Sequence, residues 1–172
     1  MRTLMPTLML VLAAFPSYAE GIEARLGAMA HDVGVFGNRK EEGLDANIEF
    51  LFPAPAWLGA VGGPRPHVGA SVSFAGDTSQ VYGGLSWAWR PVAGLFLEGS
   101  LGAAAHDGRL SNGGTDRKEL GTRLLFRESV SVGVELDGAH SVMVTFDHIS
   151  NANLGRHNEG MDNLGLRWGY RF

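Results

Sequence analysis

The chain has 172 residues, which is enough for one domain, and its formal net charge of −4 argues against nucleic acid as a partner. It contains no cysteine, which excludes a disulfide-stabilised fold. Beyond the N-terminal segment, no stretch is apolar for the ~20 residues that a membrane-spanning helix needs. A mean hydropathy near zero is compatible with membrane strands, in which apolar and polar positions alternate and cancel.

Residues 1–19 have the pattern of a secretory signal peptide. After a short basic start, residues 4–15 are apolar but too few to span a bilayer as a helix. The last three residues, SYA, place small side chains where a signal peptidase cleaves. A buried first helix is disfavoured by Pro6 and Pro16. We therefore expect residues 20–172 to form one mature domain.

Eight later runs alternate between two rows of side chains, which is typical of β-strands. One row of each run is apolar, and the opposite row carries small or charged residues. In chain order the predicted runs are residues 22–31, 44–52, 67–74, 81–90, 95–103, 120–136, 141–147 and 163–172.

This pattern predicts an all-β fold, an eight-stranded antiparallel β-barrel. A soluble barrel with its apolar row inside is the alternative, and the alternation alone does not distinguish the two. A transmembrane barrel of the outer-membrane type is favoured because the polar rows combine full charges with many glycines, as a packed polar lumen requires. Aromatic residues also gather near strand ends, and the last residue is Phe172 of an apolar row.

With both termini on the periplasmic side, four connections are expected to face outward: residues 35–43, 76–80, 106–118 and 151–161. The third connection holds candidates for contacts with lipid phosphates, unless it is a simple solvated loop: Arg109, Arg117 and Lys118. Ion pairs inside the lumen are expected from Glu98, Arg123, Arg127 and Glu135. Side chains fill an eight-stranded barrel, so the predicted protein is not a diffusion pore.

Three residues near the end of the chain are candidates for catalysis. His148 and Ser150 lie two apart, and Asp162 directly precedes the last run. Residues two apart in a strand share a face, with Cα atoms roughly 6.5 Å apart. Parity places all three on the outward, lipid-facing wall, where a base, a nucleophile and an orienting carboxylate could act together. The plain alternative is that these rows turn polar where the strands leave the hydrocarbon.

A longer string supports the catalytic interpretation. Residues 148–152 read HISNA, and residues 158–162 read NEGMD. Together they resemble the C-terminal signature of the lipid A 3-O-deacylase (PagL) family, which runs His-x-Ser-Asn-Ala, a short loop, Asn-x-Gly and an acidic residue. The resemblance covers about residues 126–172. It implies an outer-membrane barrel and an esterase that removes the primary acyl chain at the 3 position of lipid A.

The resemblance also implies roles for single residues. Ser150 would be the nucleophile, His148 the general base and Asp162 the orienting acid, at a position where a known member of the family carries glutamate. Asn158 matches the family's oxyanion position, and Asn151 is interpreted as a support for the loop, unless both are simple turn residues. No cofactor is expected, and the histidines show no metal-ligand spacing.

The implied partners are lipid A, or lipopolysaccharide, as substrate and the other lipids of the outer membrane, with no nucleic acid; a homodimer is left open. Two alternatives also stay open. A non-catalytic outer-membrane barrel of the adhesin or opacity type predicts nothing special about His148 and Ser150. An outer-membrane phospholipase would use the same residues on a different lipid.

Overall fold

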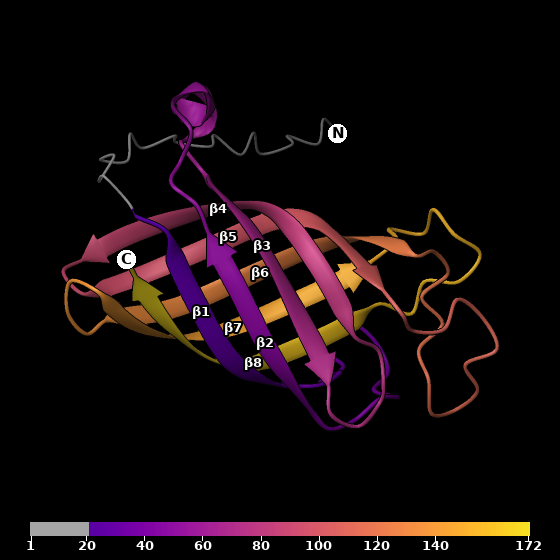
Figure 1. The fold of residues 1–172 in the computed structure, drawn as a ribbon. Coiled ribbons are helices and arrows are strands. Elements are labelled where there is room, and N and C mark those ends of the chain that lie inside the picture. Colours follow the sequence, from indigo (N-terminus) through magenta and orange to yellow (C-terminus); the bar gives the residue numbers. More distant parts are fainter. Residues whose placement is uncertain (1–20) are drawn as a thin grey trace, which may run out of the picture.

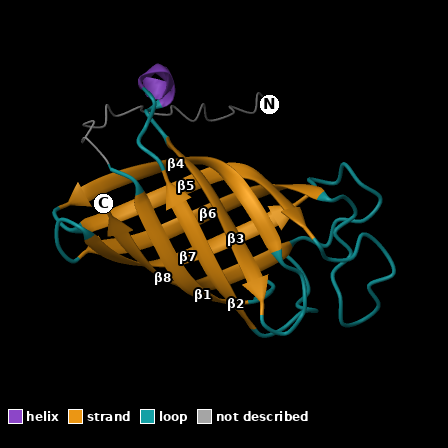
Figure 2. Cartoon of the chain, viewed as in Figure 1, coloured by secondary structure: helices purple, strands orange, loops and turns teal. Residues whose placement is uncertain are grey.

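The computed structural model describes residues 21–172, so the predicted signal peptide at residues 1–19 lies outside the described residues. Eight strands follow one another around a closed barrel (Figure 1, Figure 2). The strands are β1 (Glu23–Ala30), β2 (Leu44–Leu51), β3 (Arg65–Ser73), β4 (Gln80–Val92), β5 (Leu95–His106), β6 (Leu124–Glu135), β7 (His140–Ser150) and β8 (Met161–Arg171).

Every strand is antiparallel to its neighbours, and β1 pairs with β8, so no sheet edge is left open. The predicted eight-stranded antiparallel barrel is therefore confirmed. The C-terminus lies with the short turns at one end of the barrel, and the long loops lie at the other (Figure 1). Between β2 and β3 the chain forms a short 3-10 helix, Ala56–Val61. In the described part of the chain, no helix is long and apolar enough to cross a bilayer.

The alternation along the strands sorts side chains by their chemistry. The outward rows are apolar and exposed, as at Leu26, Val130 and Leu166. The inward rows are polar and buried, as at Arg25 and Arg167. A soluble barrel would have the opposite arrangement, so the soluble alternative is wrong and the apolar wall is suited to lipid.

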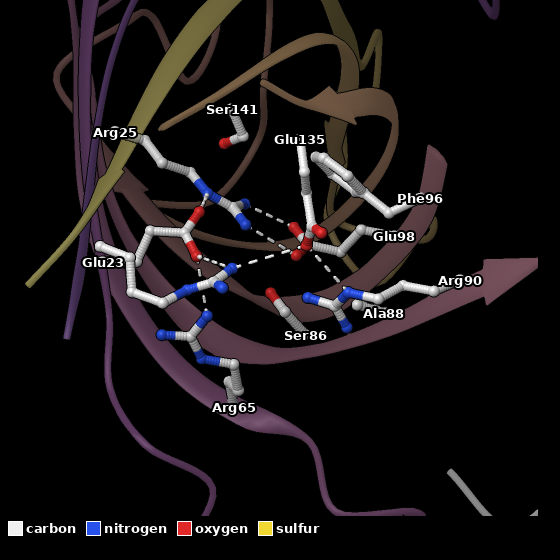
Figure 3. A pocket seen from close by; sticks show the side chains of 11 residues that line it. Glu23, Arg25, Arg65, Ser86, Ala88, Arg90, Phe96, Glu98, Glu135 and Ser141 are labelled. Atoms are coloured by element: carbon white, nitrogen blue, oxygen red, sulfur yellow. Dashed lines mark hydrogen bonds and ion pairs between the residues drawn. The ribbon is translucent and has the colours of Figure 1, made fainter. Parts of the chain in front are cut away.

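Paired charges fill the lumen. The Arg25 guanidinium donates hydrogen bonds to Glu23 at 2.7 Å, to Glu49 at 3.1 Å and to Glu98 at 2.6 and 2.8 Å. Figure 3 shows the guanidinium of Arg25 facing the carboxylate of Glu98 beside a small pocket at one end of the lumen. Because a buried charge costs several kcal/mol unless it is paired, this network is what allows the interior to be polar.

The predicted lumen ion pairs are confirmed except at Arg123. Arg127 contacts Asp147 at 2.9 Å, and the carboxylate of Glu135 accepts a hydrogen bond from Arg90 at 3.0 Å. Arg123 is exposed instead, and it donates to the backbone carbonyls of His106 and Gly108. Its guanidinium lies among the outer loops, where water is available, so it needs no buried carboxylate.

The sixth strand begins later than the sequence pattern predicts. β6 starts at Leu124, because Gly121 adopts a left-handed backbone with φ of +76° and interrupts the extended chain. Leu120, expected on the outward row, is fully buried in an apolar cluster with Leu125 and Ile149. This cluster packs beneath the outer loops, next to the outer ends of β6 and β7.

A buried polar cluster joins three of the outer loops. The His31 ring donates to Asp45 at 2.9 Å and to Glu41 at 2.9 Å. Glu41 also accepts hydrogen bonds from the backbone N–H groups of Thr78 and Lys118. Burial lowers the pKa of His31, but the hydrogen bonds to the two carboxylates outweigh burial and raise that pKa to about 9. His31 is therefore a cation at neutral pH.

Candidate active site

The antiparallel pairing of β7 and β8 brings His148 and Asp162 side by side. The two residues are direct cross-strand partners, and both belong to outward rows. The His148 Nδ1 atom lies 2.6 Å from Asp162 Oδ1. Since a carboxylate only accepts, Nδ1 carries the hydrogen and the Nε2 lone pair is left to take a proton. This is the arrangement that an orienting acid gives a general base.

The loop between β1 and β2 covers Asp162 on the outer wall. The backbone N–H of Phe36 donates to Asp162 Oδ2 at 2.6 Å, and the N–H of Val33 donates to the backbone carbonyl of Asp162 at 2.7 Å. As a result the Asp162 side chain is only 3 % exposed although its row faces outward. Both carboxylate oxygens are engaged, one by His148 and one by the loop, so the acid is held in one orientation.

The ring of Phe36 completes this cover. It meets His148 edge-on, with ring centroids 5.4 Å apart, and it meets Phe146 in the same way at 5.8 Å. Sequence reasoning treated residues 35–43 as a polar connection and missed this role. The available signal was a pair of apolar residues, Val35 and Phe36, in an otherwise polar loop. Nothing in the sequence linked them to residues more than a hundred positions away.

Gly160 makes the close approach of the last loop to His148 possible. Its backbone is left-handed, with φ of +63°, and a Cβ at this position would lie 2.9 Å from His148 Cε1. A larger residue would push the imidazole away from Asp162 and also strain the backbone. The glycine of the Asn-x-Gly part of the motif is therefore explained by the lack of space for a side chain next to His148.

Ser150 lies two residues beyond His148 on the same outward row, opposite Phe126 of β6. Within residues 21–172, no group forms a hydrogen bond with its hydroxyl, so the structure brings the base and the acid into contact and places the serine beside them. The contact between a nucleophile and its base is often long before substrate binds, and it tightens in the reacting complex.

Asn151 and Asn158 fix the loop that follows Ser150. The buried Asn151 side chain donates to the carbonyls of Leu120 at 2.9 Å and His157 at 2.6 Å. The backbone N–H of Asn151 donates to Asn158 Oδ1 at 2.8 Å, so the Asn158 amide lies against the peptide bond that joins Ser150 to Asn151. Its Nδ2 donates one hydrogen to Asn153 at 3.1 Å, and an amide nitrogen carries a second.

The basic residues of the third outer loop are not arranged as expected. Lys118 is buried and pairs with Asp32 at 3.1 Å, so its interpretation as a phosphate contact is wrong. Arg117 pairs with Asp77 at 2.5 Å, which leaves Arg109 as the exposed cation of the three. As for metals, no group of three or more His, Asp or Glu side chains among residues 21–172 is placed to hold an ion.

Known proteins resemble this chain in family pattern and in fold. A model of the lipid A 3-O-deacylase (PagL) family matches residues 53–171. The crystal structure of the outer membrane enzyme PagL superposes with a TM-score of 0.62 at 19% identity, covering 88% of this chain and 99% of that chain. The N-terminal β-barrel domain of Pseudomonas aeruginosa OprF superposes with a TM-score of 0.59 at 9% identity, covering 89% of this chain and 98% of that chain. Neisserial surface protein A superposes with a TM-score of 0.59 at 10% identity, covering 88% of this chain and 97% of that chain.

At these identities the structural likeness shows the fold of an outer-membrane barrel and no more. No curated protein sequence matches the chain. The matched family model includes all of β3 to β8, and therefore the strands and the loop that carry His148, Ser150 and Asp162.

Proposed function

The chain belongs to the lipid A 3-O-deacylase (PagL) family, and we propose that it hydrolyses the ester that holds the primary acyl chain at position 3 of lipid A. The observation that carries this proposal for the present chain is the 2.6 Å contact between His148 Nδ1 and Asp162 Oδ1, on the lipid-facing wall next to Ser150. A histidine oriented by a covered acid is the arrangement that activates a serine.

The first half of the proposed reaction transfers the acyl chain to the protein. Ser150 Oγ attacks the ester carbonyl while His148 Nε2 takes its proton. The tetrahedral intermediate collapses, the bond to the sugar oxygen breaks, and His148 returns the proton to that oxygen. The products of this half are a lipid with a free 3-hydroxyl group and an acylated Ser150.

The second half releases the fatty acid. Water attacks the acyl-serine and gives its proton to His148, and the proton then returns to Ser150 Oγ as the fatty acid leaves. The second Nδ2 hydrogen of Asn158 is the candidate donor to the oxyanion in both halves. The position of its amide against the peptide after Ser150 supports this role, and the contacts of Asn151 with Leu120 and His157 support its role in holding the loop.

The location of the site fits a substrate that stays in the membrane. An acyl chain of a lipid in the outer leaflet can lie along the apolar wall, so the reacting ester reaches Ser150 laterally and no deep pocket is needed. A non-catalytic adhesin-like barrel gives no reason for the cover over Asp162. That cover buries a carboxylate on a lipid-facing row, where charge is costly, and it orients the carboxylate toward a histidine.

Mass spectrometry of lipid A from cells that express the protein tests the proposal. Wild type is expected to remove one primary acyl chain, and Ser150→Ala is expected to lower the rate by at least about 10³-fold. Ser111→Ala, an exposed serine of the third outer loop, is the matched control and should behave as wild type. Identical lipid A from wild type and Ser150→Ala would refute the proposal. Serine-dependent loss of acyl chains from phospholipids instead would identify a phospholipase.

A further inference from the structure

A buried ion pair lies against the inside of the loop between β1 and β2. The Lys118 Nζ atom lies 3.1 Å from Asp32 Oδ1, and both side chains are almost fully buried. The same ammonium group donates a hydrogen bond to the backbone carbonyl of Asn38. A Cβ at Gly37 would lie 3.7 Å from Nζ, so the loop backbone packs closely around the charge. Taking a charge out of water is costly even when it is paired, so this arrangement calls for a reason.

Asp32 closes the loop at its base. Its Oδ2 accepts hydrogen bonds from the backbone N–H groups of Lys40 at 2.8 Å and Glu41 at 3.2 Å. Its own backbone is left-handed, with φ of +44°, a conformation that aspartate adopts more readily than most residues. One carboxylate oxygen therefore joins the two ends of residues 33–39, and the other oxygen pairs with the Lys118 ammonium group that these residues surround.

The closed segment carries the donors that hold the proposed orienting acid. The backbone N–H of Val33 donates to the carbonyl of Asp162 at 2.7 Å, and the N–H of Phe36 donates to its Oδ2 at 2.6 Å. Both donors lie between the two ends that Asp32 joins. The direction of each N–H depends on how this segment is folded, and so on the contacts with Lys118. These contacts connect the third outer loop, which supplies the lysine, to the acid that binds the imidazole.

We propose that Lys118 and Asp32 are positioning residues: their ion pair fixes the loop between β1 and β2 in the fold that keeps Asp162 aligned with His148. This inference rests on the proposed function for the role of Asp162. Replacing a buried ion pair by apolar side chains of similar volume is often neutral or stabilising, so stability alone does not account for the pair. An ammonium group has three donors, which lets it bind a carboxylate and the Asn38 carbonyl at once.

The test measures how fast a fluorophosphonate phosphonylates Ser150 in the purified protein in detergent micelles. This probe needs an activated serine but no lipid A, and the rate is expressed per folded protein, judged by heat-modifiable mobility in gels. We expect Lys118→Met, which nearly keeps the length of the side chain and removes its charge, to lower the rate constant by about 5- to 20-fold. Arg117→Met removes the neighbouring cation, which pairs with Asp77 instead, and is the matched control. Its rate constant should stay within about twofold of wild type.

Two further variants separate positioning from folding. The double variant of Asp32→Asn and Lys118→Met leaves no unpaired buried charge, so it is expected to fold. Its rate should still fall by about fivefold or more, because no ammonium group remains to hold the Asn38 carbonyl. In an Asp162→Asn background, Lys118→Met should change the rate by less than about twofold, because the acid through which the lysine acts no longer orients the imidazole.

Other results would overturn the inference. A double variant that reacts as fast as wild type would mean that the loop holds Asp162 without the ion pair. An equal loss from Lys118→Met in the wild-type and Asp162→Asn backgrounds would mean that the pair supports the fold in general. Deacylation of lipid A is measured separately. If wild type reacts with the fluorophosphonate but releases no acyl chain from lipid A, the deacylase proposal fails, whereas the phosphonylation rates still decide the role of Lys118.

Discussion

Asp162 shows how a short acid can hold the base. Aspartate is one methylene shorter than the glutamate that the family resemblance led us to expect, yet its Oδ1 lies 2.6 Å from His148 Nδ1. The side chain reaches because the two residues are direct cross-strand partners, and because the Phe36 N–H fixes the other oxygen. The shorter acid thus fits a site in which a loop lies close over it.

Replacing the charge of Asp162 separates orientation from packing. Asp162→Asn is expected to lower the rate of lipid A deacylation by about 10²–10⁴-fold, because an amide can donate to His148 and favour the wrong tautomer. Asp162→Glu is expected to lower this rate by less than Asp162→Asn does, because glutamate keeps the negative charge. Some loss is expected because its longer side chain must fit under Phe36. Rates are measured on protein whose folding is checked by heat-modifiable mobility in gels. Full activity in Asp162→Asn would show that the acid does not orient His148.

The loop between β1 and β2 acts as an element of the site. Its backbone binds Asp162 and Asn163 at the start of β8, with the N–H of Asp32 donating to Asn163 Oδ1 at 3.1 Å. Its Lys40 pairs with Glu159 of the last loop at 2.6 Å. The loop is therefore tied to both sides of the segment that carries Gly160, and it excludes water and lipid from one side of the imidazole.

Phe36 is the side chain that tests this role. Phe36→Ala keeps the backbone donor but removes the edge-on contact with His148, so we expect kcat to fall by about 2- to 10-fold. Val35→Ala, its exposed neighbour in the same loop, is the matched control and should leave kcat unchanged. A similar loss in both variants would mean that the loop contributes general stability rather than a contact at the imidazole.

At the scale of the whole molecule, the barrel is filled with paired charges and closed by the cluster around His31. This cluster connects the outer ends of β1 and β2 to the second and third outer loops through Glu41. Burial raises the pKa of Glu41, but the hydrogen bonds from His31, Lys118 and Thr78 outweigh burial and lower it to about 2. The cluster therefore combines a cationic histidine with an ionised carboxylate over the neutral pH range.

The raised pKa of His31 makes the stability of this end of the barrel depend on pH. A pKa of about 9 in the folded state, against an ordinary value of 6.5, stabilises the fold fully below pH 6.5, and the contribution is lost as the pH rises through 9. We expect the free energy of unfolding, measured in urea with the protein in vesicles, to fall by about 1–3 kcal/mol over that interval.

His31→Gln should be less stable than wild type at pH 6.5, and the difference should narrow towards pH 10. The contribution of Glu41 has the opposite sense, because its pKa is lowered: it is present above pH 4.5 and lost as the pH falls through about 2. A wild-type stability that does not change between pH 6.5 and 10, relative to His31→Gln, would contradict a charged histidine in the cluster.

The sequence by itself determined the number of strands, the antiparallel order and which side of each strand faces lipid. These features follow from the alternation of side chains with a period of two residues. This alternation is a local property of each strand and does not depend on how the loops fold. Parity alone also placed His148, Ser150 and Asp162 on one wall. Where local backbone chemistry interrupted the period, as at Gly121, the prediction for Leu120 was wrong.

Only the tertiary structure decided how the site is completed. The cover by Phe36 and the burial of Lys118 depend on which strands are neighbours and on how the outer loops pack against one another. Outer loops have no period, and their contacts join residues far apart in the chain, so no local pattern encodes them. The register placed Asp162 directly opposite the histidine, and loop packing buried this aspartate although its row faces outward.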